Sequence, residues 1–258
     1  MNTGFVVSAD GTRIAYETAG SGTALMLLHG GGQNRGIWQR AGWLPHLTGR
    51  FRVIAVDLRG HGDSDKPMHA AAYAIDRLCD DILSVADAAG VSRFSLWGYS
   101  YGGNIGRYLA ARSRRLERFA MIGVSFGPPV DDAFRQTVLE MREHWKSLVE
   151  ADRAGTLDVA TLPEPERALW LSGQVPVMLT WLGALLEWPP VEPEEVRCPT
   201  LWVAGTLNTA CMRGVDQYRA RLDSTPVRVA IVNGLTHADE LAKVDRMIPP
   251  LLEFMDAT

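Results

Sequence analysis

The feature of this sequence that most constrains its fold is a regular alternation between short apolar runs and longer amphipathic segments. Short apolar runs predict buried β-strands, and the amphipathic segments between them predict helices that pack on the resulting sheet. A chain that repeats this order forms parallel strands joined by crossover helices. The sequence therefore predicts an α/β fold with a mostly parallel, eight-stranded sheet and helices on both faces.

Eight strands and four helices of this core are predicted from the pattern. The strands are expected at residues 5–8, 13–18, 24–28, 51–57, 94–98, 119–124, 200–205 and 227–233, and the helices at residues 75–89, 102–113, 215–222 and 241–255. The tripeptide "ADG" between the first two strands is typical of a hairpin. This edge of the sheet is therefore predicted to be antiparallel.

Residues 128–190 interrupt the alternation and are predicted to form an inserted all-helical cap. The core domain would then consist of residues 1–127 and 191–258. Apolar side chains recur at helical spacing in the first part of the insert, and four of the eight tryptophans of the chain lie in it: Trp145, Trp170, Trp181 and Trp188. We interpret these rings as core packing or as contacts to an apolar substrate, with Trp145 and Trp181 as the candidate substrate-binding side chains.

Composition excludes several classes of function. The net charge of −4 gives no reason to expect nucleic acid as a partner. The most apolar stretch, residues 175–188, has 14 residues, too few to cross a bilayer as a helix. The N-terminus has no basic region followed by an apolar run, so export is not expected. The three cysteines lack C-x-x-C spacing, which disfavours disulfides and zinc and fits a reducing cytoplasm.

The stretch "GYSYGG" at residues 98–103 places G-x-S-x-G between an apolar run and a predicted helix. A nucleophilic serine in such a turn has a strained backbone, and Gly98 and Gly102 remove side chains that would collide. The following helix directs its N-terminal N–H groups at a developing oxyanion. The alternative is that Ser100 is a small residue between glycines that pack a helix against a strand.

A second glycine-rich stretch, "HGGG" at residues 29–32, follows a predicted strand. Its backbone N–H groups are candidates for an oxyanion hole, with one donor from Gly31 or Gly32 and the other from Tyr101. Gly32 is also a candidate substrate contact. The alternatives are a flexible loop or a phosphate cradle, but the sequence has no P-loop or dinucleotide-binding pattern.

His237, in "GLTH", follows the last predicted strand and is the candidate general base. A histidine suits this role because its ordinary pKa lets it take a proton from serine and return it near neutral pH. The other five histidines carry weaker signals. We interpret His29 and His61 as structural hydrogen-bonding residues, and we assign no role to the remaining three: His46, His69 and His144.

Five segments in one order carry a resemblance to a known family: residues 29–32, 57–67, 98–103, 201–208 and 234–237. The chain resembles the α/β-hydrolase superfamily, in its serine hydrolase branch with a helical lid. The resemblance implies a Ser-His-acid triad, a lid inserted after the sixth strand, an oxyanion hole at Gly31 and Tyr101, and no cofactor. It also makes the aspartate-rich loop at residues 57–65 a structural turn, and we assign no metal. Haloalkane dehalogenases and epoxide hydrolases share this fold but place Asp at the nucleophile position, where this chain has Ser100.

The chain departs from the family pattern at the third triad position, where members usually carry Asp and this chain has Asn208. An amide can hold the imidazole by its carbonyl oxygen but supplies no charge, and Asn at this position lowers kcat by about 10⁴-fold in serine proteases. Three explanations stay open. Asn208 acts in an intrinsically easy reaction, or it replaces a natural Asp, or another carboxylate serves: Asp131, Asp132, Asp239 or Glu240.

These observations favour a hydrolase that cleaves a small carboxylic ester, thioester or lactone through Ser100 and His237, with Asn208 as the third candidate catalytic residue. The expected partner is a small-molecule substrate with an apolar part, and no membrane is expected. Two alternatives stay open. The chain is a catalytically weak ligand-binding protein of the same fold, or it is a lyase that uses the same pair with Lys146. The sequence leaves the substrate and the oligomeric state open.

Overall fold

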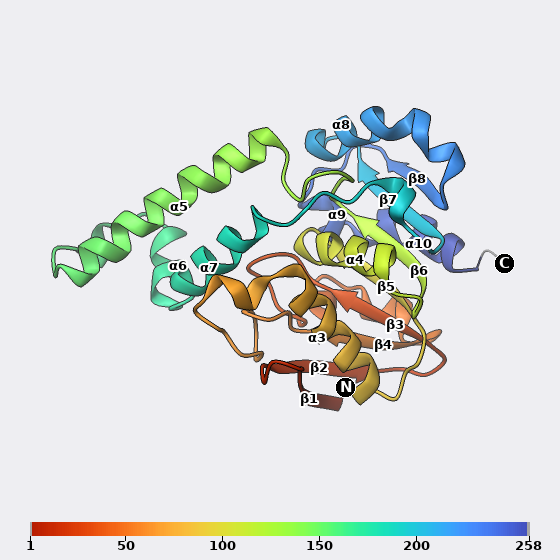
Figure 1. The fold of residues 1–258 in the computed structure, drawn as a ribbon, viewed down its shortest axis with the longest axis horizontal. Helices are drawn as coiled ribbons and strands as arrows, with labels where there is room; N and C mark the ends of the chain where they lie inside the picture. Colours follow the sequence, from red (N-terminus) through yellow and green to blue (C-terminus); the bar gives the residue numbers. More distant parts are fainter. Residues whose placement is uncertain (1, 257–258) are drawn as a thin grey trace.

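The computed structural model describes residues 2–256 and shows one eight-stranded sheet with helices on both faces (Figure 1). The strand order is β1-β2-β4-β3-β5-β6-β7-β8. The pairings β1–β2 and β2–β4 are antiparallel, and every pairing from β4 to β8 is parallel. The predicted α/β fold class is therefore confirmed.

Each of the eight predicted strands overlaps an observed one. The strands are β1 (Asn2–Val7), β2 (Arg13–Ala19), β3 (Thr23–Leu28), β4 (Phe51–Val56), β5 (Phe94–Tyr99), β6 (Leu116–Ile122), β7 (Thr200–Gly205) and β8 (Val227–Val232). The hairpin predicted between the first two strands joins β1 to β2 in antiparallel register. The central strands β3, β5 and β7 are buried over most of their length, as their continuous apolar runs indicate.

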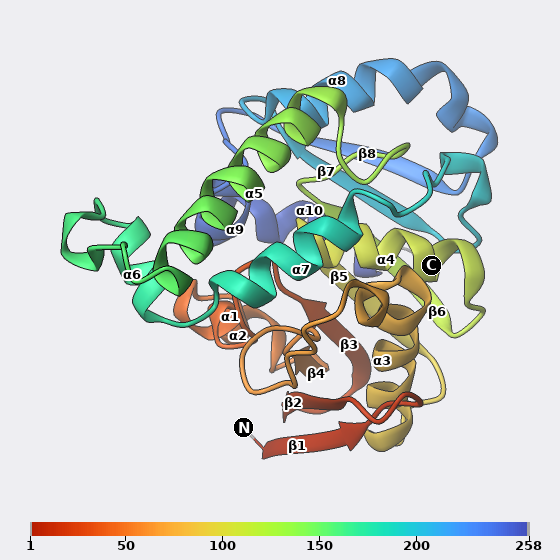
Figure 2. The ribbon, with the colours of Figure 1, turned by 60° about the vertical axis from the view of Figure 1, so that its left-hand side comes forward.

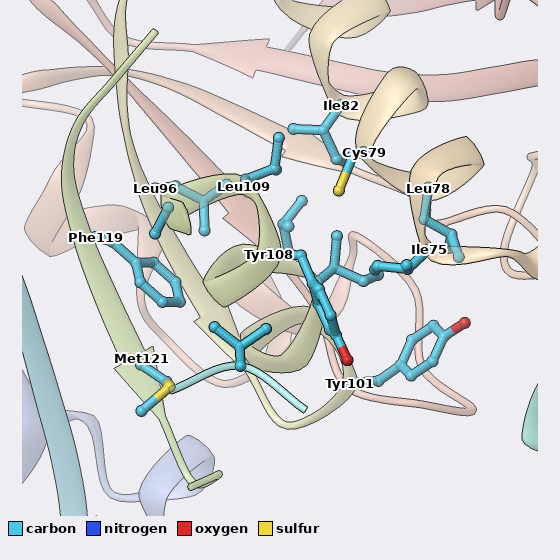
Figure 3. Close-up of a cluster of buried hydrophobic side chains, with 14 of the residues drawn as sticks. Ile75, Leu78, Cys79, Ile82, Leu96, Tyr101, Tyr108, Leu109, Phe119 and Met121 are labelled. Carbon is cyan, nitrogen blue, oxygen red and sulfur yellow. The ribbon is translucent and has the colours of Figure 1, made fainter. Parts of the chain in front are cut away.

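Two helical layers cover the sheet. Helices α3 (Ile75–Ala88), α4 (Tyr101–Arg112) and α8 (Thr209–Tyr218) pack on one face, and α1 (Ile37–Arg40), α2 (Leu44–Leu47), α9 (Asp239–Ala242) and α10 (Val244–Asp256) pack on the other. Figure 3 shows buried side chains of α3, α4, β5 and β6 packed together, with the Phe119 ring of β6 beside Leu96 and the Tyr108 ring of α4 on the side of that helix that faces α3. Short 3₁₀ turns complete the core: η1 (Ala70–Tyr73), η3 (Pro193–Glu195) and η4 (Arg219–Ser224).

Two helix boundaries differ from the prediction in ways that matter for function. The helix expected at 215–222 begins six residues earlier, at Thr209, because the Asn208 side chain accepts a hydrogen bond from the Cys211 N–H and caps it. The helix expected at 241–255 is two helices, α9 and α10, which meet at Lys243. The prediction followed the apolar period and missed both the cap and the break.

The segment 128–190 is helical and lies over the carboxyl ends of the strands. It contains α5 (Asp132–Arg153), η2 (Val159–Thr161), α6 (Glu166–Leu171) and α7 (Val175–Leu185). An antiparallel bridge between Gly127 and Val191 brings the two ends of the segment together. Figures 1 and 2 show α5 extending beyond the sheet and α7 lying between α5 and the core. We call residues 128–190 the lid. No helix within residues 2–256 is both long and apolar enough to span a membrane.

Candidate active site

Ser100 occupies a strained turn between β5 and α4. Its backbone angles are φ 53° and ψ −115°, and it is the single non-glycine residue with positive φ among residues 2–256. Such a conformation costs about 1–3 kcal/mol and persists where the surrounding structure enforces it. Here the Ser100 N–H donates to the Ile122 carbonyl at 2.9 Å, which ties the turn to β6. The serine therefore sits at the N-terminus of α4, above the carboxyl end of β5.

Two glycines permit this turn because neighbouring backbone approaches them closely. A Cβ atom at Gly98 would lie 2.4 Å from the Gly102 carbonyl oxygen, and a Cβ atom at Gly102 would lie 2.4 Å from the Leu28 carbonyl oxygen. Any larger residue at either position would collide with backbone. The two sequence interpretations of this stretch are thus compatible: the glycines pack α4 against the sheet, and that packing raises the Ser100 hydroxyl at the rim.

The structure brings Ser100 and His237 together, although 137 residues separate them. His237 Nε2 lies 3.1 Å from Ser100 Oγ. The Tyr99 ring stacks on the imidazole at 5.0 Å, and the Tyr99 hydroxyl donates to the His237 carbonyl at 2.9 Å. Sequence reasoning missed Tyr99, whose signal was its place beside the serine at the end of a buried strand. The His237 side chain is 45% exposed, so solvent reaches one side of the pair.

The opposite ring nitrogen, His237 Nδ1, faces two buried side chains. Glu240 Oε2 and Asn208 Nδ2 each lie 3.3 Å from it. The Asn208 carbonyl, which the sequence suggested as a support for the ring, accepts instead from the Cys211 N–H at 3.2 Å. Asn208 therefore presents its NH₂ group to this part of the site and donates to the Glu240 carboxylate at 3.0 and 3.1 Å.

The other three candidate carboxylates have different partners or positions. Asp131 caps α5 through the Phe134 N–H at 2.8 Å and pairs with Arg213 at 2.6 Å. Asp239 is held by the N–H and hydroxyl of Thr236, and hydrogen bonds from Thr236 lower its pKa. Asp132 lies in the exposed first turn of α5. Glu240 is the one candidate that contacts the imidazole.

Two buried histidines hold the glycine-rich loop after β3. His61 Nε2 accepts from the Gly32 N–H at 3.1 Å, and His29 Nε2 accepts from the Leu58 N–H at 3.1 Å. Their Nδ1 atoms therefore carry the protons and face the carbonyls of Arg59 and Gly30. Burial lowers the pKa of His29 to about 3 and that of His61 to about 4, so both rings are neutral near pH 7.

The two predicted oxyanion donors are the N–H groups of Gly31 and Tyr101. Neither donates to an acceptor within the described part of the chain. Tyr101 is the first residue of α4, where the helix leaves its N–H groups without internal partners. Gly32, the other candidate in this loop, has φ 72°, and its N–H donates to His61 Nε2. The N–H of Tyr101, the residue directly after Ser100, and the N–H of Gly31 in the glycine-rich loop are thus both unpaired within residues 2–256.

The two lid tryptophans singled out in the sequence have different surroundings. The Trp181 ring lies 5.3 Å from His61 and 5.0 Å from Tyr101, and a Cβ atom at Gly31 would lie 2.7 Å from its edge. Trp145 instead stacks on Trp170 at 6.4 Å, inside the lid. Sequence reasoning gave no separate role to Trp188, which stacks on Tyr101 at 5.4 Å. The lid therefore reaches the glycine loop through Trp181.

The remaining candidate groups lie apart from this cluster. Asp57 accepts from the backbone and guanidinium of Arg35 and from the Asp63 N–H, as expected of a structural turn. Lys146 pairs with Glu143 at 3.8 Å on the exposed side of α5. Across residues 2–256, no three histidine, cysteine or acidic side chains gather as a metal site would require.

Comparison with known proteins gives the following relationships. A family model described as alpha/beta hydrolase fold matches residues 23–209, which is more than half of the chain. A soluble epoxide hydrolase from a Corynebacterium species is 37% identical over 107 residues, and the match covers 42% of this chain and 36% of that relative. A solved hydrolase from Pseudomonas aeruginosa has a TM-score of 0.77 at 24% identity, with 99% of each chain covered. An esterase from Exiguobacterium antarcticum has a TM-score of 0.74 at 21% identity, with 98% of this chain and 99% of that one covered.

Proposed function

The chain belongs to the alpha/beta hydrolase family, and from that premise we propose that it is a serine hydrolase of a small carboxylic ester, thioester or lactone. The observation that carries the proposal is the 3.1 Å distance between Ser100 Oγ and His237 Nε2 at a strained strand-to-helix turn. A nucleophile within hydrogen-bond reach of a histidine base is the geometry that acyl transfer requires.

The reaction proceeds in two halves. Ser100 Oγ attacks the substrate carbonyl while His237 Nε2 takes the hydroxyl proton, and the N–H groups of Gly31 and Tyr101 bind the oxyanion of the tetrahedral intermediate. His237 then gives the proton to the leaving alcohol, thiol or ring oxygen, and an acyl-enzyme on Ser100 remains. Water, deprotonated by His237, attacks this acyl group, and collapse of the second intermediate releases the acid and restores Ser100.

Several relatives are epoxide hydrolases and dehalogenases, and their resemblance to this chain does not transfer their chemistry. In those enzymes the family pattern places an Asp at the nucleophile position. Its carboxylate forms an ester with the substrate. Here Ser100 stands at that position. The lyase alternative depended on Lys146, whose side chain is 61% exposed and paired with Glu143. We therefore favour acyl transfer over both. The partner we propose is a small-molecule substrate whose apolar part contacts Trp181.

The test is hydrolysis of p-nitrophenyl butyrate together with labelling by a fluorophosphonate. Ser100→Ala is expected to lower kcat by at least about 10³-fold, because removal of a triad nucleophile costs this much or more, and to abolish labelling. The matched control is Ser113→Ala, at the opposite end of α4, which is expected to retain both.

Full activity in the Ser100→Ala protein would remove the assignment. Absence of turnover in the parent protein across an ester panel, with thermal stabilisation by a small ligand, would favour the ligand-binding alternative instead.

A further inference from the structure

We propose that Glu240 supplies the negative charge of the triad and that Asn208 is a positioning residue for its carboxylate. The inference rests on the proposed function, because it concerns the group that acts through His237. The family usually places its acid after the seventh strand, and some relatives place it after the sixth. Glu240 comes three residues after the histidine itself, at the start of α9.

The Glu240 carboxylate is held as a buried charge must be. Its side chain is fully buried, and no lysine or arginine of residues 2–256 forms an ion pair with it. A buried charge is tolerated where hydrogen-bond donors replace water. Three donors converge here: the Gly205 N–H at 2.7 Å, the Asn208 NH₂ group at 3.0 and 3.1 Å, and His237 Nδ1 at 3.3 Å. These hydrogen bonds thus fix the carboxylate in a position that faces the imidazole.

The proton on the His237 imidazole also needs an acceptor. A general base needs Nε2 free toward the serine, so the proton of the neutral ring must sit on Nδ1 and must have an acceptor. Asn208 cannot be that acceptor, because its oxygen is used by the Cys211 N–H and its nitrogen is a donor. Glu240 Oε2 is the acceptor that remains. The same carboxylate also stabilises the imidazolium that forms when Ser100 gives up its proton.

The space around the Glu240 carboxylate leaves no room for a second acid. Gly123 follows β6 with φ 76°, and a Cβ atom there would lie 2.6 Å from Glu240 Oε2 and 2.8 Å from His237 Nδ1. An acid side chain after the sixth strand would therefore compete for the same place. An Asp at position 208 would put a second carboxylate about 3 Å from Glu240, and two like charges that close cannot both stay ionised. The amide at 208 and the glycine at 123 thus fit a carboxylate that comes from position 240.

The main experiment substitutes Glu240→Gln, which keeps the size of the side chain and removes its charge. We expect kcat for p-nitrophenyl butyrate to fall by about 10²- to 10⁴-fold, as for loss of a triad acid. The double variant Asn208→Asp/Glu240→Gln moves the charge back beside Nδ1 from the neighbouring position and is expected to recover at least tenfold of the lost rate. Asp239→Asn, one residue away, half-buried and with no contact to the imidazole, is the matched control and is expected to keep the parent rate.

A second readout does not depend on turnover. Nitrogen NMR of the His237 ring, recorded in a Ser100→Ala background, reports which ring nitrogen carries the proton. We expect Nδ1–H with Glu240 present and a substantial Nε2–H population in the Glu240→Gln protein. If Glu240 had only a structural role, a Glu240→Gln protein with unchanged circular dichroism and thermal midpoint would keep the proton on Nδ1.

Three outcomes would overturn the inference. The first is a folded Glu240→Gln protein with the parental rate and tautomer. The second is a failure of the double variant to recover activity although it is folded. The third is a gain of tenfold or more in the activity of the single variant Asn208→Asp, because such a gain would show that the site lacks its acid at position 208. We expect this single variant to lose activity. Each of these leaves the Ser100→Ala result intact, so a failure here is distinguishable from a failure of the proposed function.

Discussion

At the carboxyl rim of the sheet, the side chains of Glu240 and His61 are almost completely buried, whereas helix α5 of the lid leaves Phe134 and Leu139 exposed by 48% and 39%. The rim groups are held by several hydrogen bonds each, as Glu240 is by Gly205, Asn208 and His237. The lid contacts the rim through two rings, Trp181 beside His61 and Tyr101, and Trp188 on Tyr101. Under the proposed function, the rim groups transfer protons and must be fixed to within a fraction of an ångström, whereas an apolar cover needs only to exclude water.

Substitutions at the rim and in the lid should therefore act on different properties. At the rim, a change of one atom should affect the chemistry, because each group there has a specific donor or acceptor. In the lid, a change should affect stability or substrate affinity, because the contacts are apolar and less directional. The following predictions test this division.

The largest effect is expected from added bulk at the rim. Gly102→Ala puts a Cβ atom 2.4 Å from the Leu28 carbonyl oxygen, and we expect a loss of more than about 4 kcal/mol in the free energy of unfolding, together with loss of esterase activity. Gly173→Ala, in the lid, meets no atom within 4 Å and has φ 68°, so about 1 kcal/mol is expected from backbone strain. Urea unfolding measures both. Equal losses in the two proteins would contradict the claim that the rim tolerates added bulk less well than the lid.

A second pair of variants separates the lid tryptophans. Trp181→Ala removes the ring over Gly31 and Tyr101, and we expect kcat/KM to fall about tenfold and stability by about 3–4 kcal/mol. Trp145→Ala removes a ring stacked on Trp170 inside the lid and is expected to lose similar stability with less than a twofold change in kcat/KM. A larger kinetic effect in Trp145→Ala than in Trp181→Ala would show that the substrate lies farther out, between α5 and α6.

The pH dependence of stability should come from the rim. Burial lowers the pKa of His61 to about 4, from an ordinary value near 6.5. Below pH 6.5 the unfolded chain therefore binds a proton at His61, whereas the folded protein binds that proton only below about pH 4. The free energy of unfolding should fall as the pH drops through this window, by about 3 kcal/mol for this group.

Urea unfolding between pH 7 and pH 4 tests that expectation. His61→Asn is expected to be less stable at pH 7, because Gly32 loses its acceptor, and to show a shallower fall toward pH 4. His144→Gln, at a half-exposed lid position, is the control and is expected to follow the parent curve. An unchanged slope in His61→Asn would contradict the assignment.

The smallest effect is expected where the lid begins, at the N-cap of α5. Arg213 pairs with Asp131 at 2.6 Å, and the two side chains are 59% and 39% exposed. Exposed pairs contribute little, so Arg213→Ala should cost less than about 1 kcal/mol and should leave kcat unchanged. A loss as large as that of Trp181→Ala would show that this pair, rather than apolar packing, holds the lid in place.

Much of the molecule could be predicted from local pattern. Every strand predicted from its apolar run overlaps an observed one, and the segment where the alternation stops is helical in the structure, because strand period and helix period are properties of neighbouring residues. The start of α8 was missed by six residues because the prediction followed apolar spacing. Asn208 was then considered as an acid replacement, although Asn is a preferred N-cap residue.

The candidate site likewise contains groups that local pattern could predict and groups that it could not. Local motifs were enough to single out Ser100, the glycine-rich loop and His237 as candidates, because each lies in a short stretch whose chemistry follows from its own residue types. The sequence left four carboxylates open as the acid, since a side chain's partner depends on how distant segments meet. That Glu240, Asn208 and Gly123 share one buried space behind His237 became visible in the folded chain. Burial and hydrogen-bond direction arise when β6, β7 and α9 come together, and no stretch of sequence carries them alone.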